Sequence, residues 1–269
     1  MKRFIVKIFI LLSICFMGFN FSQASEQFDI NDSIINDKFE VPQISTNEMK
    51  KAIKNGALII DNRPYFEWAV SHIPNAVTVS PKPGISRALY TSDKEEIKKL
   101  ANNDKSKLII LYCDGIYCGK TRRVSKELVQ EGFKNVYRYQ LGIPVWRALG
   151  NLTQCEIEGV RYIYEKDGTA YFIDSRKENE FKTKNLKISK NIPHDKVLEG
   201  KDVGEIFKAK EDGRLPVDDR NTRIVVFGKN LQETLKVADA IAKEAFHNVC
   251  FFAGKVEEIL NLEALNSSK

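Results

Sequence analysis

The sequence predicts an α/β protein built from two tandem domains, each a parallel sheet with helices on both faces. Two observations lead to this fold class. Short apolar runs, typical of strands buried on both faces, alternate with segments of helical periodicity. The same order of segments recurs in the second half at an offset of 112 to 119 residues, which indicates a duplicated α/β unit.

The first unit begins with a helix start signal. Ser45 and Glu48 have the spacing of a capping box, so a short helix is expected to follow and to end near Gly56. The continuously apolar run 57–60 then predicts a buried parallel strand. This strand ends at Asp61.

A second apolar run, 108–112, predicts the next buried strand, and it ends at Cys113. A loop leads from there into a helix over 121–131, which carries an apolar stripe. A short strand over 135–139 and a helix containing Trp146 complete the unit.

The second half repeats this order. Its counterparts are 170–176 for 58–63, Asn191-Ile192-Pro193 for His72-Ile73-Pro74, 223–228 for 108–113, a helix around 237–245 and a strand over 249–252. The first unit ends its central strand on Cys113, whereas the second ends on Gly228. Because glycine has no side chain to act as a nucleophile, only the first unit is expected to be catalytic.

The N-terminus has the layout of a secretory signal peptide over 1–24. A basic start precedes the uncharged apolar run 8–19, and small residues stand before a cleavage site after Ala24. We expect an exported, periplasmic protein without stable membrane insertion after cleavage; a signal anchor or a lipid on Cys15 are the alternatives. A loose arm over 25–42, a catalytic domain over 43–151 and a second domain over 156–265 would follow.

Charge and cysteine content exclude several classes. Removing the three basic residues of the leader from 42 Lys+Arg leaves 39 against 36 Asp+Glu, so nucleic acid is not an expected partner. Four cysteines remain, Cys113, Cys118, Cys155 and Cys250, and four cysteines can pair in three ways. Their spacing does not fit a structural zinc site, and no metal is expected.

Cys113 is the candidate nucleophile. Ligands of parallel sheets bind beyond the carboxyl ends of the strands, and the helix N-terminus that follows favours an anion. Lys120, Arg122 and Arg123 add positive charge, which Asp114 opposes. A thiol in this setting is expected to have a lowered pKa. The alternative is a buried structural cysteine.

Three motifs in order resemble the signatures of rhodanese domains. The first is Asp61-x-Arg63-x-x-x-Glu67-Trp68-x-x-x-His72-Ile73-Pro74-x-Ala76, the second is the Tyr112-Cys113 loop, and the third is Asn135-Val136-Tyr137 followed by Gly142 and Trp146. The resemblance covers 45–150 and, more weakly, 156–262. It implies a sulfurtransferase that takes a sulfane sulfur from a small anionic donor such as thiosulfate. The sulfur is held as a Cys113 persulfide and passes to a thiophilic acceptor, without cofactor.

The resemblance also implies roles for the residues around the thiol. The loop would form an anion cradle with Lys120 and Arg122 as electrostatic helpers: Asp114, Gly115, Ile116, Tyr117, Cys118, Gly119, Lys120, Thr121 and Arg122. Four residues, Asp61, Arg63, Glu67 and His72, are expected to be structural.

The loop departs from the common Cys-x-x-Gly-x-Arg form. It is similar to a rhodanese subgroup with Cys-Asn-Gly-x-x-Cys-x-Lys-Ser loops, and Cys118 stands where the arginine of the common form would be. The natural donor and acceptor therefore stay open, and a protein partner is possible.

Two other functions remain open from the sequence. Cys113 and Cys118 are close enough in the chain to form a disulfide, which would make the protein a thiol–disulfide or persulfide relay with Cys118 as the resolving thiol. Alternatively, a tandem protein with one domain that lacks the cysteine can be a non-catalytic binding module.

Overall fold

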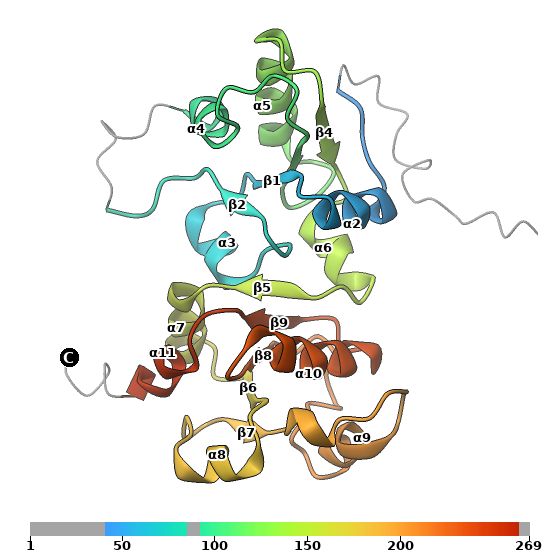
Figure 1. Cartoon of the computed structure of the whole chain (residues 1–269), viewed down its shortest axis with the longest axis vertical. Helices are drawn as coiled ribbons and strands as arrows, with labels where there is room; N and C mark the ends of the chain where they lie inside the picture. Colours follow the sequence, from blue (N-terminus) through green and yellow to red (C-terminus); the bar gives the residue numbers. More distant parts are fainter. Residues whose placement is uncertain (1–40, 85–91, 264–269) are drawn as a thin grey trace, which may run out of the picture.

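A computed structural model describes residues 41–84 and 92–263, which form two α/β domains stacked along the long axis of the molecule (Figure 1). The expected signal peptide and nearly all of the arm, residues 1–40, lie outside the described residues. Within the described ranges, no helix has both the length and the apolar character needed to cross a bilayer.

The first domain contains a four-stranded parallel sheet. Its strands are β1 (Leu58–Asp61), β2 (Val77–Thr78), β3 (Ile109–Tyr112) and β4 (Val136–Tyr139), in the spatial order β2-β1-β3-β4. Its helices are α2 (Thr46–Lys54), α3 (Tyr65–Val70), α4 (Asp93–Leu100), α5 (Gly119–Gln130) and α6 (Gly142–Ala148).

The second domain contains a five-stranded parallel sheet. Its strands are β5 (Thr153–Cys155), β6 (Tyr171–Asp174), β7 (Lys190–Asn191), β8 (Ile224–Phe227) and β9 (Val249–Phe252), in the order β5-β9-β8-β6-β7. The surrounding elements are α7 (Ile157–Lys166), α8 (Glu178–Thr183), the 3-10 turn η2 (His194–Lys196), α9 (Gly204–Glu211), α10 (Leu231–Lys243) and α11 (Val256–Leu260).

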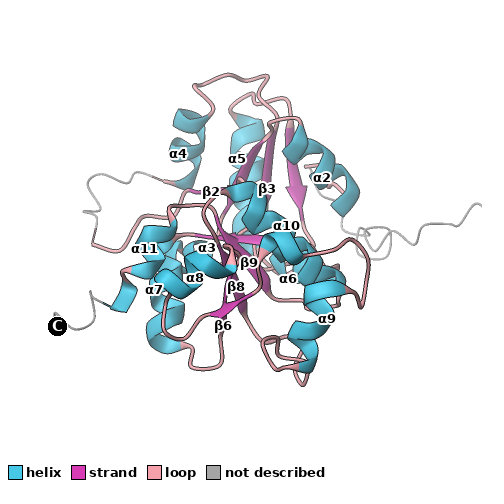
Figure 2. Cartoon of the chain, turned by 60° about the horizontal axis from the view of Figure 1, so that its bottom comes forward, coloured by secondary structure: helices cyan, strands magenta, loops and turns pink. Residues whose placement is uncertain are grey.

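Both sheets are covered on two faces, which explains why their central strands are apolar at every position (Figure 2). In the first domain, α2 and α6 pack on one face, and α4 and α5 pack on the other. In the second, α9 and α10 cover one face, and α7 and α11 cover the other. The predicted fold class, two tandem parallel α/β units, is confirmed.

The capping box predicted at the start of the first unit is present. Ser45 Oγ accepts from the Glu48 N–H, and the Glu48 carboxylate accepts from the Ser45 N–H at 2.7 Å. The second sheet begins with β5 at Thr153, three residues before the start expected for the second domain. This strand is short and polar at its centre, so the sequence does not reveal it.

One part of the predicted repeat alignment is wrong. Asp61 pairs with Thr78 and Asp174 pairs with Asn191, so Asn191 corresponds to Thr78, at an offset of 113, and not to His72. The wrong alignment arose because an Ile-Pro pair follows both His72 and Asn191. Elsewhere α3 and α8 correspond at the same offset of 113 residues.

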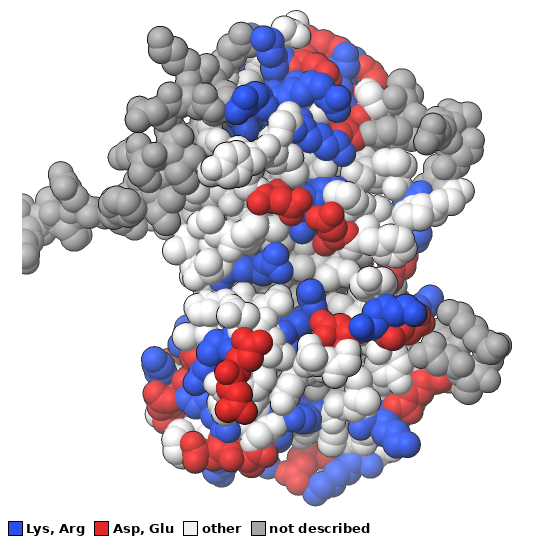
Figure 3. Space-filling view, turned by 180° about the vertical axis from the view of Figure 1, so that it is seen from behind, with Lys and Arg blue, Asp and Glu red and all other residues white. Residues whose placement is uncertain are grey.

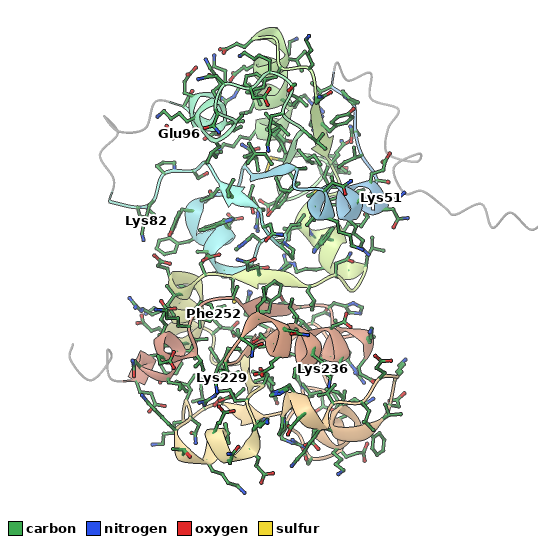
Figure 4. All side chains as sticks on the ribbon, in the orientation of Figure 1. Lys51, Lys82, Glu96, Lys229, Lys236 and Phe252 are labelled. Carbon is green, nitrogen blue, oxygen red and sulfur yellow. A yellow bond between two sulfur atoms is a disulfide. The ribbon has the colours of Figure 1, made fainter. Side chains whose placement is uncertain are left out.

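The two domains are joined through backbone and charged contacts. The His72 N–H donates to Gln154 O and the Gln154 N–H donates to His72 O, both at 2.8 Å, so β5 of the second sheet also binds the first domain. Lys82, labelled in Figure 4, reaches Glu158 on α7 at 2.5 Å. Positive and negative side chains are distributed over both domains on the face seen in Figure 3.

Candidate active site

Cys113 lies directly beyond the last residue of β3, at the carboxyl edge of the first sheet. Its side chain is buried, with 7% of its surface exposed. A disulfide joins it to Cys118, and the two Cα atoms are 6.3 Å apart. Cys118 is the N-cap residue of α5. The bond therefore ties the strand end to the start of the helix.

The first residues of α6 pack against the loop between the two cysteines. The Ile143 N–H donates to Cys113 O at 3.1 Å. A Cβ on Gly142, whose φ is +65°, would stand 2.3 Å from Cys113 O and 2.5 Å from Gly115 N. Only glycine permits this approach, so Gly142 sets the position of the loop.

The loop residues expected to cradle an anion differ in exposure. Asp114 is largely exposed, Tyr117 is 95% exposed, and the Ile116 carbonyl accepts from Gln140 Nε2 at 3.4 Å. Gly115 has a φ of +123°, and its carbonyl accepts from the Cys118 N–H.

The start of α5 carries the remaining predicted site residues. Gly119 is its first residue, and the buried Thr121 donates through Oγ1 to Cys118 O at 3.3 Å. Arg122 is exposed on the first turn. Lys120 does not reach freely into the loop: its ammonium pairs with the buried Asp93 at 3.0 Å and donates to Ser80 Oγ. That carboxylate neutralises the charge that the sequence assigned to anion binding.

Asp61 and Arg63 form a buried ion pair beneath the site. Arg63 donates to both carboxylate oxygens of Asp61 and also to Ser71 O. Tyr112 donates its hydroxyl to Asp61 Oδ2 at 2.5 Å and accepts from the Ile73 N–H. Burial raises the pKa of Tyr112 well above its ordinary value, so the hydroxyl stays protonated. The network fixes the ends of β1 and β3.

Two carboxyl groups stand at the rim of the loop. The pKa of Glu67 is raised by partial burial and by the nearby charge of Asp114. Arg63 Nε lies 3.9 Å from Asp114 Oδ1, but its main partner is Asp61. The rim is thus less favourable to a small dianion than the sequence suggests.

His72 lies in the contact between the domains, where it pairs with Gln154. It is 1% exposed, stacks on Trp68 with ring centroids 4.8 Å apart, and places Nδ1 2.9 Å from the Trp68 carbonyl. Burial lowers its pKa to about 4, although Glu156 Oε1 lies 3.5 Å from Nε2. The structure thus gives His72 neighbours that pack and orient it.

One polar residue beside Cys113 was missed by the sequence comparison. Asn62 follows β1, is 1% exposed, and donates its N–H to Tyr112 O. Among the residues that the structure describes, its side-chain amide has no hydrogen-bond partner. The sequence could have indicated Asn62, because it is a polar residue that directly follows a buried strand next to the strand that carries the thiol.

The second domain retains the frame without the thiol. Asp174 and Arg176 form the same buried ion pair as their counterparts, and Arg176 also donates to Lys184 O. At the tip of β8, a Cβ on Gly228 would stand 2.1 Å from Ser175 Oγ. Ser175 therefore fills the space that the cysteine side chain takes in the first domain.

The first domain, which carries Cys113, matches a known protein family. A family model for the rhodanese-like domain matches residues 45–149. Residues 45–149 form a rhodanese-like domain. The second sheet repeats its strand order with one added edge strand, so the chain contains two tandem units of this architecture. Within the described residues, no group of three or more histidine, cysteine or acidic side chains is arranged to hold a metal.

The curated relatives are longer proteins. The tRNA uridine(34) hydroxylase of Hamiltonella defensa subsp. Acyrthosiphon pisum is 31% identical over 146 residues, which cover 54% of this chain and 35% of that protein. The same-named protein of Buchnera aphidicola subsp. Schizaphis graminum is 24% identical over 167 residues, covering 60% and 48%. This chain spans less than half the length of either relative.

Solved structures with similarity to the chain include sulfur-transferring enzymes. SseA of Escherichia coli, described as a 3-mercaptopyruvate sulfotransferase with the rhodanese fold, is 17% identical and covers 77% of this chain and 96% of its own, with a TM-score of 0.32. The thiosulfate sulfurtransferase of Pseudomonas aeruginosa is 13% identical and covers 79% and 41%, also with a TM-score of 0.32.

Proposed function

We propose that the first domain transfers a sulfane sulfur through a persulfide on Cys113. The Cys113 thiolate attacks the terminal sulfur of the donor, an S–S bond forms on Cys113, and the donor's own bond to that sulfur breaks. The electron pair leaves with the donor. An acceptor nucleophile then takes the same sulfur and returns the thiolate, so the cycle consumes no oxidant.

One observation carries this proposal: Cys113 stands at the carboxyl end of a central strand, in a domain of the rhodanese-like family, with a helix starting directly behind its loop. Backbone N–H groups at such a helix start stabilise negative charge on a nearby sulfur. The cycle begins from the reduced loop, so the Cys113–Cys118 disulfide first takes up two electrons from a dithiol reductant.

The donor is proposed only as a sulfane-sulfur compound. Thiosulfate is a dianion, and the carboxyls of Asp114 and Glu67 at the rim of the loop would repel it. The positive charge of Lys120 does not offset them, because it is paired with Asp93. The tRNA hydroxylation named for the curated relatives is not carried to this chain, because the chain spans less than half of their length.

The disulfide favours a second candidate, a persulfide relay. In it, the Cys118 thiolate attacks the inner sulfur of the Cys113 persulfide, hydrosulfide leaves with the bonding electron pair, and the Cys113–Cys118 disulfide forms. The same pair would then exchange with protein thiols. The two candidates differ in the fate of the transferred sulfur.

The test is the intact mass of the reduced protein after incubation with thiosulfate or with a persulfide of a small neutral thiol. We expect one added sulfur atom, removable by cyanide, in the wild type and in Cys118→Ser, and none in Cys113→Ser. Sulfide release that requires Cys118 would support the relay. No added sulfur from either donor would refute sulfur transfer.

We propose further that residues 1–24 direct export and are removed after Ala24. Fractionation of expressing cells, with N-terminal sequencing of the mature protein, tests this. A mature chain beginning at Ser25 outside the cytoplasm is the expected result. An uncleaved chain in the cytoplasm would contradict it.

A further inference from the structure

Asn62 is a buried polar residue without an evident structural reason. Its side chain is 1% exposed, and neither Nδ2 nor Oδ1 has a hydrogen-bond partner among the described residues. Burying an amide in this way is unfavourable, and native proteins satisfy most such groups. An unsatisfied amide beside a candidate nucleophile therefore calls for a functional explanation.

The register of the sheet places this amide beside the thiol. Asp61 pairs with Tyr112, so the next residues along the two strands, Asn62 and Cys113, are also neighbours. Side chains alternate between the faces of a sheet, and parallel strands lie about 4.8 Å apart. Ile60 and Leu111, two positions earlier, both face α5. Asn62 and Cys113 thus share the face on which α5 begins.

The second domain shows independently where a side chain at this position points. Ser175 is the counterpart of Asn62, because each follows the strand-ending aspartate of its domain. Its Oγ lies 2.1 Å from the Cβ that a residue at Gly228 would carry, and Gly228 is the counterpart of Cys113. A side chain at this position therefore faces the β-carbon at the tip of the central strand.

We propose, resting on the persulfide function above, that Asn62 donates an Nδ2–H hydrogen bond to the reacting sulfur of Cys113. The donor is unoccupied in the disulfide form, where the sulfur carries no charge. It is used when the disulfide is reduced to the thiolate or when Cys113 carries the persulfide. Asn62 exchanges no proton and forms no covalent bond; it stabilises negative charge on sulfur.

The proposal predicts that function and stability separate. Removing a hydrogen bond to a thiolate raises the thiol pKa, whereas replacing an unsatisfied amide by an apolar group of similar shape does not destabilise the fold. Asn62→Leu is the closest apolar match in shape. Ser175→Ala, in the second domain, removes the equivalent unsatisfied polar group far from Cys113 and is the matched control.

The experiment measures the pH dependence of iodoacetamide alkylation in the full reduced chain, in a Cys118→Ser background so that Cys113 is the accessible thiol. We expect Asn62→Leu to raise the apparent thiol pKa by about one unit and, at pH values below the parental thiol pKa, to slow alkylation roughly tenfold. Ser175→Ala should leave the profile unchanged. Melting temperatures of both variants should equal or exceed that of the parent.

Two other alkylation results would count against the proposal. An unchanged profile in Asn62→Leu, or an equal shift in Ser175→Ala, would overturn it. If Asn62→Leu melts much earlier than the parent, Asn62→Ser decides: a retained hydroxyl donor should keep most of the parental thiol pKa, and a full shift would overturn the role. Alkylation needs no sulfur donor, so this outcome is independent of whether sulfur transfer itself is observed.

Discussion

The tips of the two central strands, at Cys113 and at Gly228, differ more than the domains around them. Both domains hold the end of the neighbouring strand with a buried Asp-x-Arg pair that also binds a backbone carbonyl. In the first domain six residues, 113–118, connect the strand to its helix, whereas three residues, 228–230, do so in the second.

This difference distinguishes the residues that support the fold of both domains from those that make the first site reactive. The ion pair occurs in both domains, so it belongs to the frame and does not by itself mark a reactive site. The cysteine, the longer loop and Asn62 occur only in the first domain. In the second domain, Ser175 stands in place of Asn62, and its hydroxyl fills the space beside Gly228 where a cysteine side chain would begin. Asn230 caps α10 by accepting a hydrogen bond from the Glu233 N–H.

The largest effect is expected where the longer loop meets α6. Gly142→Ala would place a Cβ against the backbone of Cys113 and Gly115 at a φ of +65°, at a cost of about 4 kcal/mol in the free energy of unfolding. Gly254→Ala in the second domain meets side-chain atoms and should cost less. Urea unfolding measures both, and equal costs would show that the close approach of Gly142 to the backbone of Cys113 and Gly115 adds nothing to the cost.

The next effect concerns acid. His72 has a pKa of about 4 in the folded chain, below its ordinary value of 6.5. The unfolded chain therefore binds the extra proton between these values, and stability present above pH 6.5 is lost as the pH falls towards 4, by roughly 3 kcal/mol. Asn185, its exposed counterpart in the second domain, does not titrate. Urea midpoints at pH 7 and pH 4.5 should converge in His72→Gln; a wild-type midpoint independent of pH would contradict this.

A cysteine grafted onto the second tip should not restore chemistry. Gly228→Cys brings its Cβ into contact with Ser175 Oγ and within 2.8 Å of Thr234 Oγ1, which should cost roughly 2 kcal/mol. In a Cys113→Ser background, intact mass should show no sulfur taken up from a persulfide donor. Uptake at position 228 would mean that the frame alone suffices.

The smallest effect is expected from making the first tip more like the second. Tyr112→Phe removes the hydrogen bonds to Asp61 and from the Ile73 N–H, while Phe227 already occupies the equivalent position of the second domain. We expect a loss of about 1.5 kcal/mol by urea unfolding. A loss near that of Gly142→Ala would show that the hydroxyl, and not the ion pair, holds the strand ends.

Local patterns explain which elements could be predicted. The Ser45 and Glu48 box interacts within four residues, and strand β9 covers the same residues, 249–252, that the apolar run predicted. Strand β5 escaped prediction because its pairing with β9 and its contact with His72 come from distant parts of the chain.

For the site, the sequence by itself determined that a cysteine follows a buried strand, that a helix starts behind it, and that the second unit has glycine there. These features depend on side-chain period and turn chemistry along the chain. Only the tertiary structure decided that Lys120 is neutralised by Asp93, that Glu67 meets Asp114, and that Asn62 stands beside Cys113. Such contacts join separate elements, and their identity depends on strand order, register and helix packing.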